Sequence, residues 1–191
     1  MAGYIGKGNA GSPTLIARTD VGSAVSEVTF DGVFSESFDW HYLIGVDVTI
    51  AAASQAIRIV RRAGGSDVTT ELDYMGHRGD NSAAVENVMV NQTVAGYFDT
   101  TADKTGTDAT RQTNSFIIAY IANPAHMPTD WGRILTSGSA GYYSGSGSAA
   151  GDDWWMERTH QLVGSTGFDG IRIYTSSGDI AGGKFLVYGM A

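Results

Sequence analysis

Residues 38–50 read FDWHYLIGVDVTI. Large apolar side chains occupy every second position: Phe38, Trp40, Tyr42, Ile44, Val46, Val48 and Ile50. The positions between them are polar or small, with Leu43 as the exception. Because the side chains of a β-strand alternate between two faces, a period of two over 13 residues predicts one long, half-buried strand. We expect its buried face to consist of Phe38, Trp40, Tyr42, Ile44, Val46 and Ile50.

Shorter stretches with a similar strand-like pattern of apolar and polar residues fill most of the chain on both sides of this strand. Strand candidates separated by turn-forming residues lie at 25–30, 56–62, 68–74, 94–98, 115–122, 131–135, 156–163, 170–174 and 184–189. The 26 glycines and only 3 prolines fit many short strands joined by tight turns. We therefore predict one all-β domain over residues 23–191, an antiparallel β-sandwich of the jelly-roll type.

The first 22 residues differ from the rest. They are rich in glycine, are interrupted by Pro13, and carry only isolated apolar side chains at Tyr4, Ile5, Leu15 and Ile16. We find neither a helical period nor a strand period in them, and such segments become ordered when they dock on something. The sequence predicts an extended N-terminal arm over residues 1–22, with those four apolar residues as its docking contacts.

Charge and hydropathy exclude several classes of partner. The chain has 12 Lys and Arg against 20 Asp and Glu, a net charge of −8, so we predict no nucleic-acid partner. Its basic cluster, Arg58, Arg61 and Arg62, lies in an alternating strand, and we interpret it as a solvated sheet face rather than a phosphate site. No run of 18 apolar residues predicts membrane insertion, and the N-terminus lacks the apolar core of a signal peptide.

Motifs for catalysis or for a cofactor are not found. Residues 6–11, GKGNAG, have the spacing of a dinucleotide-binding loop, but no strand precedes them and no helix follows. The histidines at 41, 77, 126 and 160 lack zinc-site spacing, and no nucleophile-elbow motif occurs. We expect no enzyme activity, no cofactor and no metal. The aspartates of the 99–108 and 152–153 loops are interpreted as solvated, and a calcium site, whose usual loop spacing they do not match, is the alternative.

Aromatic residues gather in the C-terminal third, near Gly/Ser loops. They are Trp131, Tyr142, Tyr143, Trp154 and Trp155, and the last two follow Asp152 and Asp153. Aromatic rings beside carboxylates are suited to sugars, because the rings stack on apolar sugar faces while the carboxylates accept hydrogen bonds from hydroxyls. These five residues are the candidate ligand contacts. Placement in the core or in a subunit interface is the alternative, and their alternation along strands favours it.

The C-terminal run at 167–189 reads GFDGIRIYTSSGDIAGGKFLVYG. It resembles the closing hairpin of a family of tailed-bacteriophage structural proteins. Residues 42–47 and 57–70 resemble the core strands of the same proteins, and the opening MAGYIG is similar to the start of tail-fibre attachment arms. The signature covers 23 residues of the 191.

This resemblance implies a virion component that carries no catalytic residues, assembles in the host cytoplasm and leaves the cell by lysis. A short tail fibre, or receptor-binding protein, would contact a host surface glycan, and the Trp154–Trp155 pair favours that role. A capsid decoration (cement) protein is the alternative, favoured because the chain has no room for a fibre shaft. A carbohydrate-binding module or a hydrolase is a further alternative. We expect a homo-oligomer, a trimer, that contacts other virion proteins through its arm.

Overall fold

The computed structural model describes residues 12–51, 57–68, 72–79, 86–90, 97–99, 115–122, 133–143, 152–162, 167–175 and 177–191. Within these ranges the chain forms thirteen strands and no helix. The strands are β1 (Thr14–Val21), β2 (Glu27–Phe30), β3 (Trp40–Ile50), β4 (Ile57–Ala63), β5 (Ser66–Val68), β6 (Leu72–Gly79), β7 (Glu86–Val90), β8 (Tyr97–Asp99), β9 (Ser115–Ala122), β10 (Arg133–Tyr143), β11 (Asp152–Leu162), β12 (Gly170–Thr175) and β13 (Ile180–Met190). The prediction of an all-β chain is confirmed for these residues.

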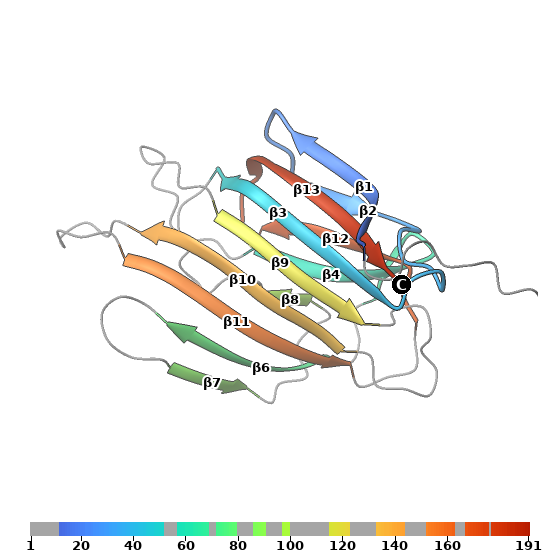
Figure 1. The fold of residues 1–191 in the computed structure, drawn as a ribbon. Coiled ribbons are helices and arrows are strands. Elements are labelled where there is room, and N and C mark those ends of the chain that lie inside the picture. Colours follow the sequence, from blue (N-terminus) through green and yellow to red (C-terminus); the bar gives the residue numbers. More distant parts are fainter. Residues whose placement is uncertain are drawn as a thin grey trace, which may run out of the picture.

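The strands form two sheets, and all strand pairs within them are antiparallel. One sheet has eight strands in the order β1-β13-β3-β9-β10-β11-β6-β7. The other has five, in the order β2-β12-β4-β5, with β8 also paired to β4. Figure 1 shows the eight-stranded sheet as a broad twisted layer, with β2, β12 and β4 behind β13, β3 and β9.

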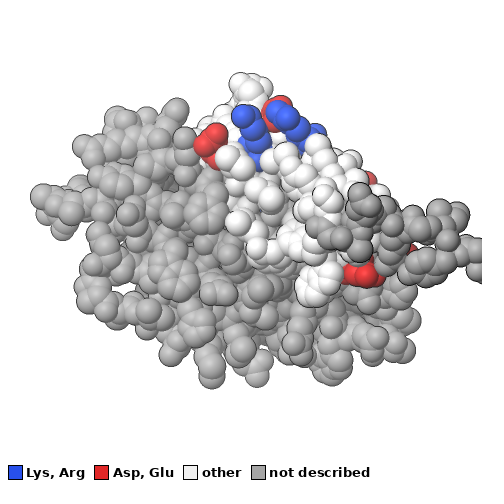
Figure 2. All heavy atoms as spheres, viewed as in Figure 1, with Lys and Arg blue, Asp and Glu red and all other residues white. Residues whose placement is uncertain are grey.

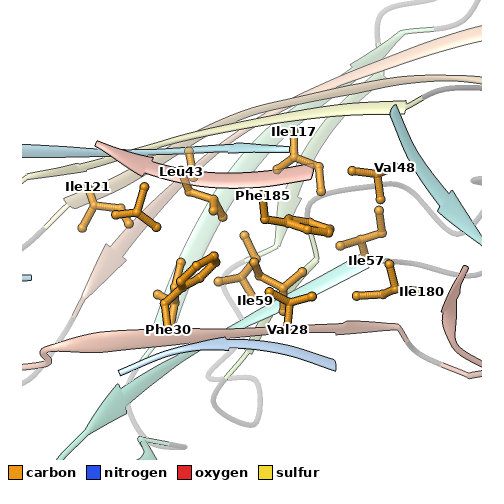
Figure 3. Close-up of a cluster of buried hydrophobic side chains, with 14 of the residues drawn as sticks. Val28, Phe30, Leu43, Val48, Ile57, Ile59, Ile117, Ile121, Ile180 and Phe185 are labelled. Atoms are coloured by element: carbon orange, nitrogen blue, oxygen red, sulfur yellow. The ribbon is translucent and has the colours of Figure 1, made fainter. Parts of the chain in front are cut away.

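The core lies between β13, β3 and β9 of the larger sheet and β2, β12 and β4 of the smaller one (Figure 3). Its side chains from the larger sheet include Leu43, Ile117 and Phe185, which have no exposed surface. Those from the smaller sheet include Ile59 and Ile173, which are equally buried. Burial of each such side chain contributes about 1.5–3 kcal/mol, so this shared cluster holds the two sheets together.

Strand β3 exists where the period of two predicts it, but most of its predicted buried face lies on the other side. His41 and Leu43 are fully buried, whereas Trp40 is 46% exposed and Val46 is 38% exposed. Tyr42 and Ile44 are only partly buried. The buried-face prediction is thus wrong for Trp40, Tyr42, Ile44 and Val46, which occupy the face that points away from the core.

A bulge in β3 turns the end of the predicted apolar row, Val48 and Ile50, towards the core. Asp47 has a φ of 55°, and the pairing of β3 with β9 shifts between Gly45 and Val48. The neighbouring strand β13 accommodates the bulge at Gly183, whose φ is 132°. An extra residue in one strand exchanges its two faces. Val48 and Ile50 are therefore buried, as Ile50 is predicted to be.

The described part of the predicted arm is a strand of the larger sheet. Strand β1 pairs with β13, with Leu15 opposite Tyr188 and Asp20 opposite Lys184. Ile16 packs against the core, and Leu15 is 48% exposed. The sequence shows no strand period here, because a bulge between Leu15 and Ala17 interrupts the alternation that would have indicated the strand. Tyr4 and Ile5 lie outside the described residues.

The C-terminal run is not a hairpin, because β12 and β13 belong to different sheets. Its connection crosses from one sheet to the other, and Thr175 Oγ1 lies 3.1 Å from the carbonyl oxygen of Ser177 and 2.5 Å from that of Gly178. At the start of β13, Ile180 exchanges backbone hydrogen bonds of 2.8 and 3.0 Å with Val25. The strand pair predicted to be a closing hairpin instead links the two sheets.

Candidate functional site

One side of the larger sheet faces away from the core and is apolar over β13, β3 and β9, with Leu15 of β1 beside them. Antiparallel partners lie on the same face, so the register defines its members. Tyr42 lies opposite both Tyr188 and Tyr120, and Trp40 lies opposite Met190. We call this surface the outer patch; its residues are Leu15, Trp40, Tyr42, Ile44, Val46, Ile118, Tyr120, Leu186, Tyr188 and Met190.

Side chains of the outer patch pack against one another. The rings of Tyr42 and Tyr120 meet edge to face, with centroids 4.9 Å apart and planes at 78°. The Tyr42 hydroxyl donates to Met190 Sδ over 3.7 Å. Aromatic residues and methionine are enriched in protein interfaces, where large and ordered side chains are buried at low cost in conformational entropy. The patch thus has the composition and the order of a contact surface.

Charged groups border the outer patch along β1 and at its two ends, since Arg18 is opposite Leu186 and Lys184 is opposite Val46 (Figure 2). Arg18 pairs with Asp20 at 2.7 Å beside β13, where Lys184 also reaches the surface. Asp47 follows Val46 in the bulge at the same end, and Asp39 precedes Trp40 at the other end.

The smaller sheet presents the opposite kind of surface, a network of ion pairs. Arg62 contacts Asp31 at 2.6 Å and Asp67 at 2.8 Å. Arg172 contacts Glu27 at 2.8 Å and also pairs with Asp67. Hydrogen bonds from Arg62 to Asp31 and Asp67 raise the pKa of its guanidinium. These arginines are already matched by carboxylates, which supports the interpretation that Arg62 is not a phosphate ligand.

Arg61 differs from its neighbour because its position in β4 points it inward. It is 2% exposed, and its guanidinium lies 5.9 Å from the ring centroid of Phe168. The interpretation of the basic cluster as a solvated face is therefore wrong for Arg61. Alternation along β4 separates Arg61 from Arg62, as it does for any two consecutive strand residues.

His41 is the most unusual buried group in the described residues. It has no exposed surface, and neither ring nitrogen has a hydrogen-bond partner there. Its ring lies 4.9 Å from that of Phe34 and 5.7 Å from that of Phe38, both edge to face. Burial lowers the pKa of His41 to about 4, so the imidazole is neutral at pH 7. Such a group belongs to the core, and no group of three or more metal-ligand side chains occurs among the described residues.

Four of the five predicted ligand-contact residues lie on neighbouring strands. Tyr142 and Tyr143 end β10, and Trp154 and Trp155 lie near the start of β11. Tyr142 is opposite Asp153 and Tyr143 is opposite Asp152, while Trp154 is opposite Gly141. The backbone thus brings these aromatic and acidic residues together at one end of the β10–β11 pair, which we call the β10–β11 end. Trp131 lies outside the described residues.

Sequence reasoning missed the outer patch. Its residues come from four strands, and all four β3 members were assigned to the core because an apolar row is the usual sign of a buried face. A signal was present in Leu43, since an apolar residue in the other row indicates that both faces of the strand are covered.

The described part of the chain contains no helix that could span a membrane. No protein-family model, no curated protein and no solved structure matches the sequence or the fold.

Proposed function

We propose that the chain is a structural protein of a tailed-bacteriophage virion, a short tail fibre or receptor-binding component that works as a homo-oligomer. The observation that carries this role is the β10–β11 end, where Tyr142, Tyr143, Trp154 and Trp155 lie on adjoining strands beside Asp152 and Asp153. Aromatic groups would stack on the apolar faces of a host surface glycan, and the carboxylates would accept hydrogen bonds from its hydroxyls.

Strands suit this role better than loops do. Residues on paired strands keep their backbone spacing through the hydrogen bonds of the sheet. Strand β11 is paired on both sides, to β10 and to β6, which fixes the position of its tryptophans along the sheet. Preorganisation of this kind reduces the entropy lost on binding.

The jelly-roll arrangement is the finer form of fold that we propose for this two-sheet chain.

The run that resembles phage structural proteins supports a structural role, because its glycines are needed for packing. A Cβ at Gly170 would overlap the carbonyl oxygen of Phe30, and one at Gly189 would overlap the ring of Phe38. A motif that preserves close contacts between strands fits a protein whose work is to hold its shape.

A capsid decoration protein is the second candidate, and the outer patch favours it. An apolar and nearly uncharged surface fits contact with protein rather than with a hydroxyl-rich glycan.

In either role we propose that residues at the N-terminus, Tyr4 and Ile5 together with the exposed Leu15, contact another virion protein. Ile16 packs against the core and is better explained as part of the sheet.

Binding of the purified, fluorescently labelled protein to host cells tests the receptor role. We expect saturable binding that falls at least tenfold in Trp154→Ala or in Trp155→Ala, since consecutive strand residues alternate between the two faces of a sheet. Tyr174→Ala is the matched control, because this aromatic residue lies on the smaller sheet, where Arg172 stacks over its ring at 4.5 Å. Absence of binding by the wild-type protein, or an equal loss in Tyr174→Ala, would contradict the receptor role. Binding to purified capsids instead of cells would favour decoration.

A further inference from the structure

Residues 31–39, which we call the strap, connect β2 to β3 and place two aromatic rings against His41. The strap contains no strand and no helix. Phe34 is 4% exposed and lies edge to face on the imidazole at 4.9 Å, and Phe38 does the same at 5.7 Å. Phe34 also meets Phe168 edge to face at 5.7 Å. Both aromatic anchors of the strap therefore rest on one titratable group.

Backbone hydrogen bonds attach the strap to the domain at single points rather than along its length. The Phe34 N–H donates to the carbonyl oxygen of Asp169, and the Asp39 N–H donates to that of Met190, each over 3.0 Å. On both sides of β3, by contrast, His41 is enclosed by paired strands, whose hydrogen bonds recur along the ladder. Because local opening begins where the contacts are fewest, the strap is the wall around His41 that opens at the lowest free energy.

The neighbours of His41 on the adjoining strands are uncharged. His41 lies opposite Gly189 of β13 and Ile121 of β9, and neither ring nitrogen has a hydrogen-bond partner among the described residues. On the smaller sheet, Arg61 also points inward, and its guanidinium lies 5.9 Å from the ring centroid of Phe168. A like charge of this kind offers an imidazolium no stabilisation.

The carboxylates around the strap do not reach the imidazole. Asp31 pairs with Arg62 at 2.6 Å, and Asp169 Oδ2 accepts a hydrogen bond of 3.4 Å from the backbone of the β4–β5 turn. Glu36 and Asp39 are exposed. None of these four carboxylates lies within hydrogen-bond distance of a ring nitrogen of the histidine. A proton bound beneath the closed strap would thus lose its hydration without gaining an ion pair.

We propose that the strap is an acid-released cover: protonation of His41 lifts Phe34 and Phe38 off the domain while the two sheets stay paired. Opening gives the imidazolium access to water and uncovers the ring of Phe168, which Phe34 contacts in the closed form. The result is a new apolar surface at this end of the sandwich. The device belongs to the fold itself and does not depend on any role on a virion or at a host surface.

The difference in pKa between the covered and the hydrated ring sets the size of the effect. Burial lowers the pKa of His41 from 6.5 to about 4, whereas a hydrated ring regains its ordinary value. Between these two values only the open form binds the proton, so opening becomes more favourable as the pH falls from 6.5 towards 4. From pH 7.5 to pH 5.0 the ratio of open to closed strap should rise about 30-fold.

Amide hydrogen exchange of the full-length protein, followed by NMR at pH 7.5 and 5.0, tests this inference. Protection factors are compared, because they divide out the effect of pH on the chemical exchange rate. We expect those of the Phe34 and Asp39 amides, whose hydrogen bonds hold the strap, to fall about 30-fold. The amide of Ile173, in the centre of the smaller sheet, should change less than threefold. His41→Phe is the matched control, because it keeps an aromatic ring that cannot be protonated, and its strap should show no such fall.

Two results would overturn the inference. Unchanged protection of Phe34 and Asp39 at pH 5.0 would show that the strap stays closed. An equal fall at Phe34, Asp39 and Ile173 would show that acid unfolds the whole domain instead. Both comparisons are made within the wild-type protein, so they hold even where His41→Phe does not fold.

Discussion

Acidification provides a direct probe of the core through His41. The imidazole is fully buried between Phe34 and Phe38, and its two nitrogens have no hydrogen-bond partner among the described residues. A charged ring there would lose its hydration without compensation. Burial therefore lowers the pKa of His41 from 6.5 to about 4 in the folded protein.

This lowered pKa determines the sign and the size of the effect. Between pH 6.5 and pH 4 the unfolded chain binds a proton at His41 and the folded chain does not, so protons favour unfolding. One pKa unit corresponds to about 1.4 kcal/mol, so the free energy of unfolding should fall by about 3 kcal/mol across this window. The stability associated with neutral His41 is fully present above pH 6.5 and is lost as the pH falls towards 4.

Urea titrations followed by circular dichroism at pH 7.5, 6.5, 5.5 and 4.5 measure the effect. Three other histidines and many carboxylates also titrate in this range, so wild type is compared with His41→Phe at each pH. Both proteins share those other groups, and the difference between their slopes isolates His41. We expect the wild-type protein to lose about 2.5 kcal/mol more than the variant between pH 7.5 and pH 4.5. Parallel pH profiles for the two proteins would refute the burial of an unpartnered histidine.

Three further predictions concern packing and charge. Leu43→Asp should lower the free energy of unfolding by about 3–5 kcal/mol, because it buries an unpaired charge, whereas Trp40→Asp should lower it by about 1 kcal/mol or less at an exposed site. Urea titration at submicromolar concentration compares the two variants. Equal losses would contradict the assignment of Leu43, rather than Trp40, to the buried face of β3. Gly189→Ala should lower the stability by about 1–3 kcal/mol, since the new Cβ displaces the ring of Phe38, and an unchanged melting temperature would contradict that contact. Asp67→Asn should cost about 1 kcal/mol through its two arginine partners; this cost should shrink in 1 M NaCl, and a cost independent of salt would argue against an electrostatic origin.

Strand existence could be predicted well from the sequence, but strand faces could not. The period of two located β3 because backbone geometry forces alternation whatever surrounds the strand. It did not show which row is buried, because the Trp40 row is apolar for a different reason, its place in the outer patch. The bulge at Asp47 then exchanged the two rows, and a single residue with positive φ leaves little trace in a hydropathy pattern.

Connections and long-range partners were also beyond local patterns. Residues 170–189 predict two strands and a turn, and both strands exist. The turn does not pair them, since β12 pairs with β2 and β4 in the smaller sheet and β13 pairs with β1 and β3 in the larger one. Similarly, β1 is a strand because β13 offers it an edge, and its own eight residues show no clear alternation.

The two candidate sites, the β10–β11 end and the outer patch, also differ in how far the sequence alone could reveal them. Clustering of aromatic residues in sequence led to the candidate ligand contacts, and the register of β10 with β11 brings four of them to one end of that strand pair; their role as ligand contacts stays a prediction. The outer patch gathers Leu15, Trp40, Tyr120 and Tyr188 from four distant segments, and only the strand order places them on one face. A site of that kind emerges from topology rather than from any local motif.

The position of the protein on a phage particle tests the central claim most directly. Particles released by lysis of the cells that make the protein can be labelled with gold-conjugated antibody raised against the purified chain, then imaged by electron microscopy. A tail fibre predicts gold at the tail tip, with none in particles from which the gene is deleted. Gold spread over the head would replace the tail-fibre role with decoration. Particles without any gold, and without the chain by mass spectrometry, would contradict a virion role altogether.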